Sequence, residues 1–268
     1  MKKRKKSYVP PDERVPVLDK LILGGSGLNS FIVNNIVTGV LWMPVFNIGF
    51  GINAAVLGIV AMIFKAWDAF LNPFVGNLSD NTRTRWGRRR PYIVAGGIAT
   101  AVLLPLVWWM PEDLGTNWMV AGLIIFGLLL YSAYTVWNIP FEALTMELTP
   151  NYDERTNIMA YIAFFGKVIG LLGGWTLAFV TSSLFAGPDG EPDIIAGVRV
   201  ASIIFAVVFL VAGVAPGIFI KERNYEKLIV SQDREPFLQS MRETASIGPL
   251  WFLIGMIFMN LLGIVSIS

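Results

Sequence analysis

The sequence predicts an all-α protein that crosses a membrane several times, because of its composition and the length of its apolar runs. Hydrophobic residues make up 54% of the 268 residues and charged residues only 15%, whereas soluble domains have about 25% charged residues. A helix needs about 20 apolar residues to cross the hydrocarbon core. Six such runs, and a seventh that reaches the last residue, lie at 27–48, 53–75, 92–111, 118–142, 159–183, 197–220 and 248–268.

The connections between these runs support the same interpretation in order along the chain. The first two runs are separated by little more than residues 47–52, which predicts a tight helical hairpin. The third run follows Pro91, a residue that suits the first turn of a helix. Glycine and proline at 187–192 mark the loop between the fifth and sixth runs. Residues 221–247 carry mixed charge, which is typical of a solvated linker before the seventh run.

Lysine and arginine fall almost entirely on one predicted side of the membrane. Of the 21 in the chain, 18 lie in the N-terminal tail or in the loops after the second, fourth and sixth runs. The loops at 47–52, 111–118 and 184–196 contain none. Since cytoplasmic loops are enriched in these residues, we predict a multi-pass protein of the inner or plasma membrane with a cytoplasmic N-terminus.

Four segments follow from this topology: a basic cytoplasmic tail (1–26), a six-helix domain (27–220), a cytoplasmic linker (221–247) and the start of a second domain (248–268). The basic tail either only enforces topology or also binds anionic lipid. Six helices, a long linker and a new helix are how one half of a two-half transporter ends. We therefore expect the chain to be part of a longer protein.

The composition also excludes several functions. The chain has no cysteine and no histidine, which removes thiolate sites, the commonest metal ligand and the usual neutral-pH base. No serine-based nucleophile motif is present, so an intramembrane enzyme is disfavoured. A net charge of +2 is too small to indicate nucleic-acid binding. We expect the lipid bilayer as a partner and no cofactor.

The stretch at 67–91 between the second and third runs is the most informative part of the sequence. Pro73 and Gly76 loosen the end of a helix and permit close packing, and Gly87 permits a tight turn. An aspartate facing several arginines could form a charge network that breaks and re-forms as a conformational latch, or the arginines could act only as a topological anchor. The predicted latch residues are Asp80, Arg83, Gly87, Arg88, Arg89, Arg90, Glu147 and Arg155.

A second block, at 137–156, reads WNIPFEALTMELTPNYDERT. This block and the 67–91 stretch resemble signatures of the major facilitator superfamily, in the form of the glycoside–pentoside–hexuronide:cation symporters, which include the melibiose permeases. Plant sucrose carriers show a related version of the first signature. The resemblance covers the first six helices and the linker. It implies an N-terminal bundle of two inverted three-helix repeats, followed by the start of helix 7.

The resemblance also implies a cation site on the second helix. Asp68 matches an acidic residue of the family's cation site, whereas the next acid of that motif is here Asn72. Asparagine can offer an oxygen to sodium but cannot release a proton. Lys65 lies three residues before Asp68 and can share its face, either in a structural ion pair or at the coupling site. A sodium ion near Asp68 is the one metal that the resemblance allows.

By the same resemblance, the family's sugar-binding acids correspond to Asn29 and Asn138. Their amides can bind hydroxyl groups or bond to neighbouring helices, and Trp137 could add an aromatic contact to the sugar. Glu142 lies four residues after Asn138; it could replace the titratable group lost at position 72 or pair with an arginine near the cytoplasmic end.

An arginine common on the family's fifth helix is replaced by an apolar residue near Ile162, and Lys167 follows five residues later. A lysine inside a span needs a partner or water, and we expect Asp68 or Glu142 to be that partner. Lys167 is therefore also a candidate substrate-binding residue, together with Asn29, Trp137, Asn138 and Glu142.

Taken together, the resemblance implies a secondary transporter that moves a sugar or glycoside by alternating access, coupled to Na⁺ or H⁺. Two alternatives stay open. The protein could be a uniporter if Asp68 is only structural. The loss of the family's carboxylates would also suit a non-transporting sensor or assembly protein on the same scaffold.

Overall fold

A computed structural model describes residues 10, 13–111, 115–187, 190–222, 246, 248, 251–252 and 255–256. The chain forms two compact units, Met1–Leu228 and Ile229–Ser268, and the helices between residues 17 and 219 all belong to the first unit. Most of the linker at 221–247 and of the helix expected at 248–268 lies outside the described residues, as do the lysines at the start of the basic tail.

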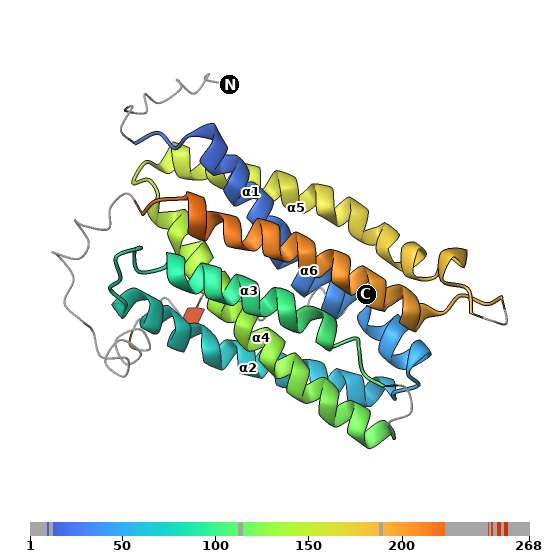
Figure 1. The fold of residues 1–268 in the computed structure, drawn as a ribbon. Helices are drawn as coiled ribbons and strands as arrows, with labels where there is room; N and C mark the ends of the chain where they lie inside the picture. The colour runs from blue at the N-terminus through green and yellow to red at the C-terminus, as the bar shows by residue number, and fades with distance from the viewer. Residues whose placement is uncertain are drawn as a thin grey trace. The chain divides into compact units, whose positions relative to one another are not determined.

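The described part of the first unit is helical apart from its loops and one isolated bridge pair, which confirms the all-α prediction (Figure 1). The elements in order are α1 (Val17–Phe31), η1 (Ile32–Val40), η2 (Pro44–Gly49), α2 (Ala54–Asn81), α3 (Arg90–Leu106), α4 (Thr116–Glu147), α5 (Tyr152–Val180), η3 (Ser183–Phe185) and α6 (Ile194–Phe219). The segments η1 and η2 are π-helical and continue the first span beyond α1.

Five helices among the described residues are long and apolar enough to cross a membrane, with α1 and its π-helical continuation counted as one. The sixth, α3, is a shorter apolar helix of 17 residues, at the lower end of the range of about 17–25 residues for a spanning helix. All six helices predicted from the first six apolar runs are therefore present.

The helices begin earlier or end later than the apolar runs at the end of the bundle where the N-terminus lies. The first begins at Val17 rather than near residue 27, and α2 continues to Asn81 rather than residue 75. Similarly, α5 begins at Tyr152, where the side chain of Asn151 accepts hydrogen bonds from two backbone N–H groups of the first turn. Hydropathy detects only the length inside hydrocarbon, whereas these polar helix ends are stabilised by caps and ion pairs.

The helices pack in the order α5–α1–α6–α3–α4–α2, with each helix against its neighbours in this series (Figure 1). Exchanging α1–α3 with α4–α6 reproduces the same pairs: α1 on α5 becomes α4 on α2, α1 on α6 becomes α4 on α3, and α3 on α6 is unchanged. Because each repeat has three spans, the second crosses in the opposite sense to the first. This pairing is what two inverted three-helix repeats require.

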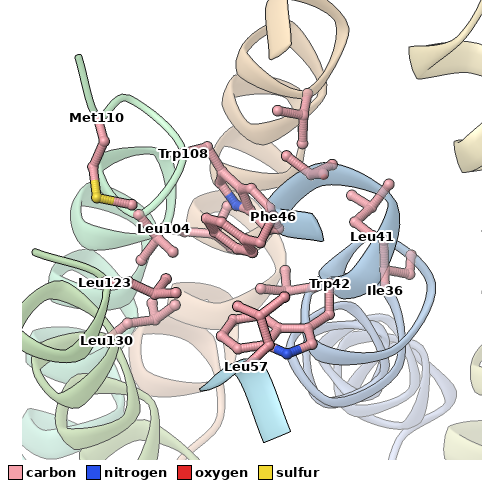
Figure 2. Close-up of a cluster of buried hydrophobic side chains, with 14 of the residues drawn as sticks. Ile36, Leu41, Trp42, Phe46, Leu57, Leu104, Trp108, Met110, Leu123 and Leu130 are labelled. Atoms are coloured by element: carbon pink, nitrogen blue, oxygen red, sulfur yellow. The ribbon is translucent and has the colours of Figure 1, made fainter. Parts of the chain in front are cut away.

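An aromatic core fills the end of the bundle where α3 ends and α4 begins (Figure 2). The rings of Phe46 and Trp108 stack with their centroids 4.7 Å apart, and the ring of Trp42 meets that of Phe46 edge-on at 4.9 Å. Leu57, Leu104 and other buried side chains of α2, α3 and α4 complete the cluster. Burial of such large side chains fixes the ends of the first span against its neighbours.

Candidate functional site

Polar side chains of α1, η1, α2 and α4 gather on one side of the bundle. We call this set the polar face; its members are Ser30, Asn34, Lys65, Asp68, Asn72, Tyr134, Thr135, Asn138 and Glu142. Asn34, Lys65 and Glu142 are exposed in the described unit. Ionisable groups within a span normally face a cavity or a partner, so the polar face is the candidate binding site.

Asp68 is held at the contact between α2 and α4. Its Oδ1 accepts a hydrogen bond from the Thr135 hydroxyl at 2.9 Å. With its amide nitrogen directed toward Asp68, Asn72 donates to the same oxygen at 3.3 Å. Lys65 makes no ion pair with Asp68 within 4 Å in the described structure; its Nζ lies 3.4 Å from Asn34 Oδ1 and above the ring of Tyr131. The structure therefore brings Asp68, Asn72 and Lys65 to one region without pairing the two charges.

Asn138 lies in the middle of the polar face. Its Oδ1 accepts hydrogen bonds from Ser30 at 3.1 Å and from the Tyr134 hydroxyl at 3.3 Å, so it links α4 to α1. Its Nδ2 donates to Glu142 Oε1 at 3.1 Å. Asn34 donates to the Tyr134 hydroxyl at 2.9 Å. The predicted pair Asn138 and Glu142 is thus brought together, and Ser30, Asn34 and Tyr134 join them.

Two residues predicted to bind substrate lie elsewhere. Asn29 is fully buried and its Nδ2 donates to the backbone carbonyl of Phe209 on α6 at 3.3 Å. Trp137 is also fully buried, and its indole N–H donates to the carbonyl of Gly213 on α6 at 2.8 Å. Both side chains therefore point toward α6 and act in interhelical hydrogen bonding.

Lys167 is exposed on α5 and makes no hydrogen bond or ion pair with any residue that the structure describes. The expected pairing with Asp68 or Glu142 is therefore not present. Ile162 lies between α5 and α1, where its side chain fits over Gly27. An apolar residue suits that helix contact, whereas Lys167 is exposed.

A second group of charges joins the ends of α2, α3, α4 and α6; we call it the arginine cluster, composed of Asp80, Arg88, Arg89, Glu147 and Glu222. Arg89 Nη2 lies 2.8 Å from both Asp80 Oδ1 and Glu147 Oε1, and Arg88 Nη2 lies 2.6 Å from the same Glu147 oxygen. Both arginines are buried. The predicted network between the 67–91 stretch and Glu147 is therefore formed.

Glu222, which the sequence places in the predicted solvated linker, is part of this cluster. Its carboxylate accepts hydrogen bonds from the backbone N–H groups of Arg88, Arg89 and Arg90 at 3.1, 2.9 and 3.3 Å. These N–H groups open α3, where a negative charge is favourable. Gly87 has φ +109°, and a Cβ there would collide with the Glu222 carboxylate. In the sequence, the one indication that Glu222 could contact the helix ends is its position close to the end of the sixth run.

The remaining predicted latch residues have separate contacts. Arg90 donates to the carbonyls of Gly217 and Ile218 at 2.7 Å each, which ties the start of α3 to the end of α6. Arg155, in the first turn of α5, donates to the carbonyl of Thr149 in the preceding loop at 3.1 Å, so it does not reach the arginine cluster. Arg83 is exposed at the start of the loop.

A six-helix bundle of two exchanged repeats, with polar and ionisable side chains on one face, defines a polytopic transporter scaffold. The family described as MFS/sugar transport proteins matches residues 25–267. The chain therefore belongs to this family, the glycoside–pentoside–hexuronide:cation symporters of the major facilitator superfamily, as the two signatures predicted. The family consists of membrane transporters and not of enzymes.

The curated relatives carry names of the same kind. An uncharacterized symporter of Synechocystis is 36% identical over 189 residues, which are 68% of this chain and 33% of that protein. The isoprimeverose transporter of Lactiplantibacillus pentosus is 31% identical over 60% of this chain and 33% of its own. A putative glycoside/cation symporter of Escherichia coli is 27% identical over 53% and 30%. The chain spans about a third of the length of these relatives.

Proposed function

We propose that the protein containing this chain is a secondary transporter that moves a sugar or glycoside across the membrane together with Na⁺ or H⁺. The observation that carries the proposal is the polar face, where hydrogen bonds join the Asn34 amide of η1 to the Tyr134 phenol, the Asn138 amide and the Glu142 carboxylate of α4. The names of two relatives, an isoprimeverose transporter and a putative glycoside/cation symporter, support this substrate class.

The amides and hydroxyls of the polar face can both donate to and accept from sugar hydroxyl groups. Amides bind hydroxyls less strongly than carboxylates do, because charge-assisted hydrogen bonds are about twice as strong. The oxygens of Asp68 and Thr135 are donors of the kind that a hard cation prefers, whereas Asn72 directs its amide nitrogen toward Asp68. In this proposal Asp68 binds the coupling cation, and sugar and cation bind on the same face of α2 and α4.

The Asp68 proposal is tested by uptake of radiolabelled isoprimeverose, a free hexose and a free pentose into proteoliposomes that contain the intact protein. We expect inward Na⁺ or proton gradients to stimulate uptake by the wild type. Asp68→Asn and Asp68→Cys should remove that stimulation, a loss of about tenfold or more for an interaction worth at least about 1.4 kcal/mol. Asp153→Asn, which neutralises an exposed acid of α5, should behave as the wild type.

Unchanged ion dependence in both Asp68 variants would show that this carboxylate does not couple transport. Uptake that is ion-independent in the wild type would indicate a uniporter. Binding of a sugar without any flux would indicate a sensor or assembly protein on the transporter scaffold.

We also propose that the N-terminus is cytoplasmic, because of the distribution of lysine and arginine. This chain contains no cysteine, so single cysteines can be placed in it and tested with a membrane-impermeant maleimide, in a protein whose cysteines outside this chain are replaced by serine. Glu191→Cys, between α5 and α6, should be labelled in intact cells, whereas Ser7→Cys should be labelled only after permeabilisation. The reverse labelling pattern would contradict this orientation.

A further inference from the structure

The polar face contains a hydrogen-bonded chain that runs from a cation to an anion and in which every donor points the same way. Lys65 Nζ donates to Asn34 Oδ1 (3.4 Å), Asn34 Nδ2 donates to the Tyr134 hydroxyl (2.9 Å), the Tyr134 hydroxyl donates to Asn138 Oδ1 (3.3 Å) and Asn138 Nδ2 donates to Glu142 Oε1 (3.1 Å). We call this series the Lys65–Glu142 chain.

The two charged ends favour the same orientation of the three neutral groups between them. An ammonium can only donate and an ionised carboxylate can only accept, so Lys65 fixes the oxygen of Asn34 toward itself and Glu142 fixes the amide nitrogen of Asn138. Hydrogen bonds in a chain also polarise one another in the same sense. The two charges therefore favour the same orientation of the neutral groups as the Ser30 carbonyl, which accepts from Asn34, and the Ser30 hydroxyl, which donates to Asn138.

The charged residues near Glu142 either have other partners or reach it only through the Lys65–Glu142 chain, so Glu142 is the end of this chain. On α2, Lys65 reaches it through the chain, while Asp68 is engaged by Thr135 and Asn72. On α1 and η1, the facing groups are the neutral Ser30 and Asn34, respectively.

The other charged and titratable groups on the packed helices have separate contacts. On α3, Arg90 bonds to carbonyls at the end of α6, and Tyr92 bonds to Thr82. On α4 itself, Glu147 is paired with Arg88 and Arg89. Among the described residues, Lys65 is the charged side chain that hydrogen bonds join to Glu142.

From this arrangement we infer that Glu142 is a proton-binding site that couples proton uptake to sugar binding through Asn138. This inference rests on the proposed sugar transport and adds Glu142 to Asp68 as a second carboxylate that coupling to H⁺ requires. A proton from water adds to one carboxylate oxygen of Glu142 and forms an O–H bond; the same bond breaks when the proton leaves on the other side of the membrane.

The physical link is the Asn138 amide. While Glu142 is ionised, the amide donates a charge-assisted hydrogen bond to it, and Oδ1 already accepts from Ser30 and Tyr134. Protonation replaces this strong acceptor by a weaker neutral one, which frees the amide N–H to bind a sugar oxygen. Proton binding therefore strengthens sugar binding, and by reciprocity sugar binding strengthens proton binding, as symport requires.

Glu142→Gln tests the coupling, because glutamine reproduces the shape and neutrality of the protonated acid. In proteoliposomes that contain the intact protein, exchange of isoprimeverose between equal concentrations should remain, since exchange needs no net proton movement. Its dependence on pH should disappear. Accumulation driven by an inward gradient of about two pH units, at most roughly a hundredfold for one proton per sugar, should fall to onefold.

Two further variants and one substrate-free measurement complete the test. Glu142→Asp, which keeps a titratable group, should recover part of the accumulation, and Glu191→Gln, which removes an exposed acid of the loop before α6, should leave it unchanged. Infrared titration with protons alone should show a protonated-carboxyl band that is absent in Glu142→Gln.

Proton-driven accumulation at the wild-type level in Glu142→Gln, or an infrared titration identical to that of the wild type, would overturn the assignment. If wild-type protein exchanged none of isoprimeverose, the free hexose and the free pentose, the proposed sugar transport would fail, and the coupling with it. In that case, an infrared band that is present in the wild type and absent in Glu142→Gln would show that Glu142 still binds a proton, so that only the sugar transport had failed.

Discussion

Gly96→Ala is expected to prevent normal folding of the bundle or to destabilise it strongly. Gly96 lies on α3 at its contact with α4, and a Cβ at this position would lie 2.5 Å from the backbone nitrogen of Trp137 and 2.9 Å from its Cα. Backbone atoms cannot turn aside as a flexible side chain can, so α3 and α4 would have to separate. In membranes, such close approach of helix backbones at small residues is a main source of helix association.

The effect can be measured as the yield of monodisperse protein in detergent and as its thermal unfolding temperature. Overpacking of a well-packed interior typically costs about 1–3 kcal/mol, and the clash with backbone places Gly96→Ala at or above the upper end of that range. Gly58→Ala is a matched control, because a Cβ at Gly58 on α2 meets no atom within 4 Å. Equal yields and unfolding temperatures for the two variants would show that α3 and α4 are not in such close contact.

The sequence predicted much of the fold, because hydropathy and charge act locally. Six spans, their approximate order and the break at 47–52 follow from apolar runs and turn residues, and the structure has all of them. Their polar ends were not predicted. Lys20 and Glu154 form a buried ion pair of 2.6 Å between the start of α1 and the start of α5, and sequence alone does not show that two charges 134 positions apart meet.

The candidate site was predicted only in part, because residue type does not show which side of a helix a residue occupies in the fold. Asn138 and its neighbour Trp137 illustrate this limit: one lies on the polar face and the other bonds to α6. In the same way, Asn29 bonds to α6, whereas its neighbour Ser30 lies on the polar face. Adjacent positions on a helix are about 100° apart, so aligning a residue with a family position does not by itself establish its direction.

Arg89→Gln is expected to slow transport by about tenfold or more, because it removes the one side chain that bridges α2 and α4 in the arginine cluster. We propose that this cluster is a conformational latch that holds the helix ends together in one state and opens in the other. Arg89 is buried and contacts Asp80 and Glu147 at 2.8 Å each. Glutamine cannot replace a guanidinium that contacts two carboxylates. Because the side chains of Asp80 and Glu147 are 51% and 35% exposed, each pair is worth less than a fully buried one.

The measurement is the rate of isoprimeverose exchange in proteoliposomes, together with isoprimeverose binding and the unfolding temperature of the same preparations. A latch affects the rate of conformational change, so the exchange rate should fall much further than binding does. Arg85→Gln is the matched control, because it removes an equal charge from an exposed position of the same loop and should leave the rate unchanged. Asp80→Asn should slow exchange less than Arg89→Gln, since Glu147 would still hold Arg89. Equal exchange rates in Arg89→Gln and the wild type would mean that the buried arginines only anchor the topology of the chain.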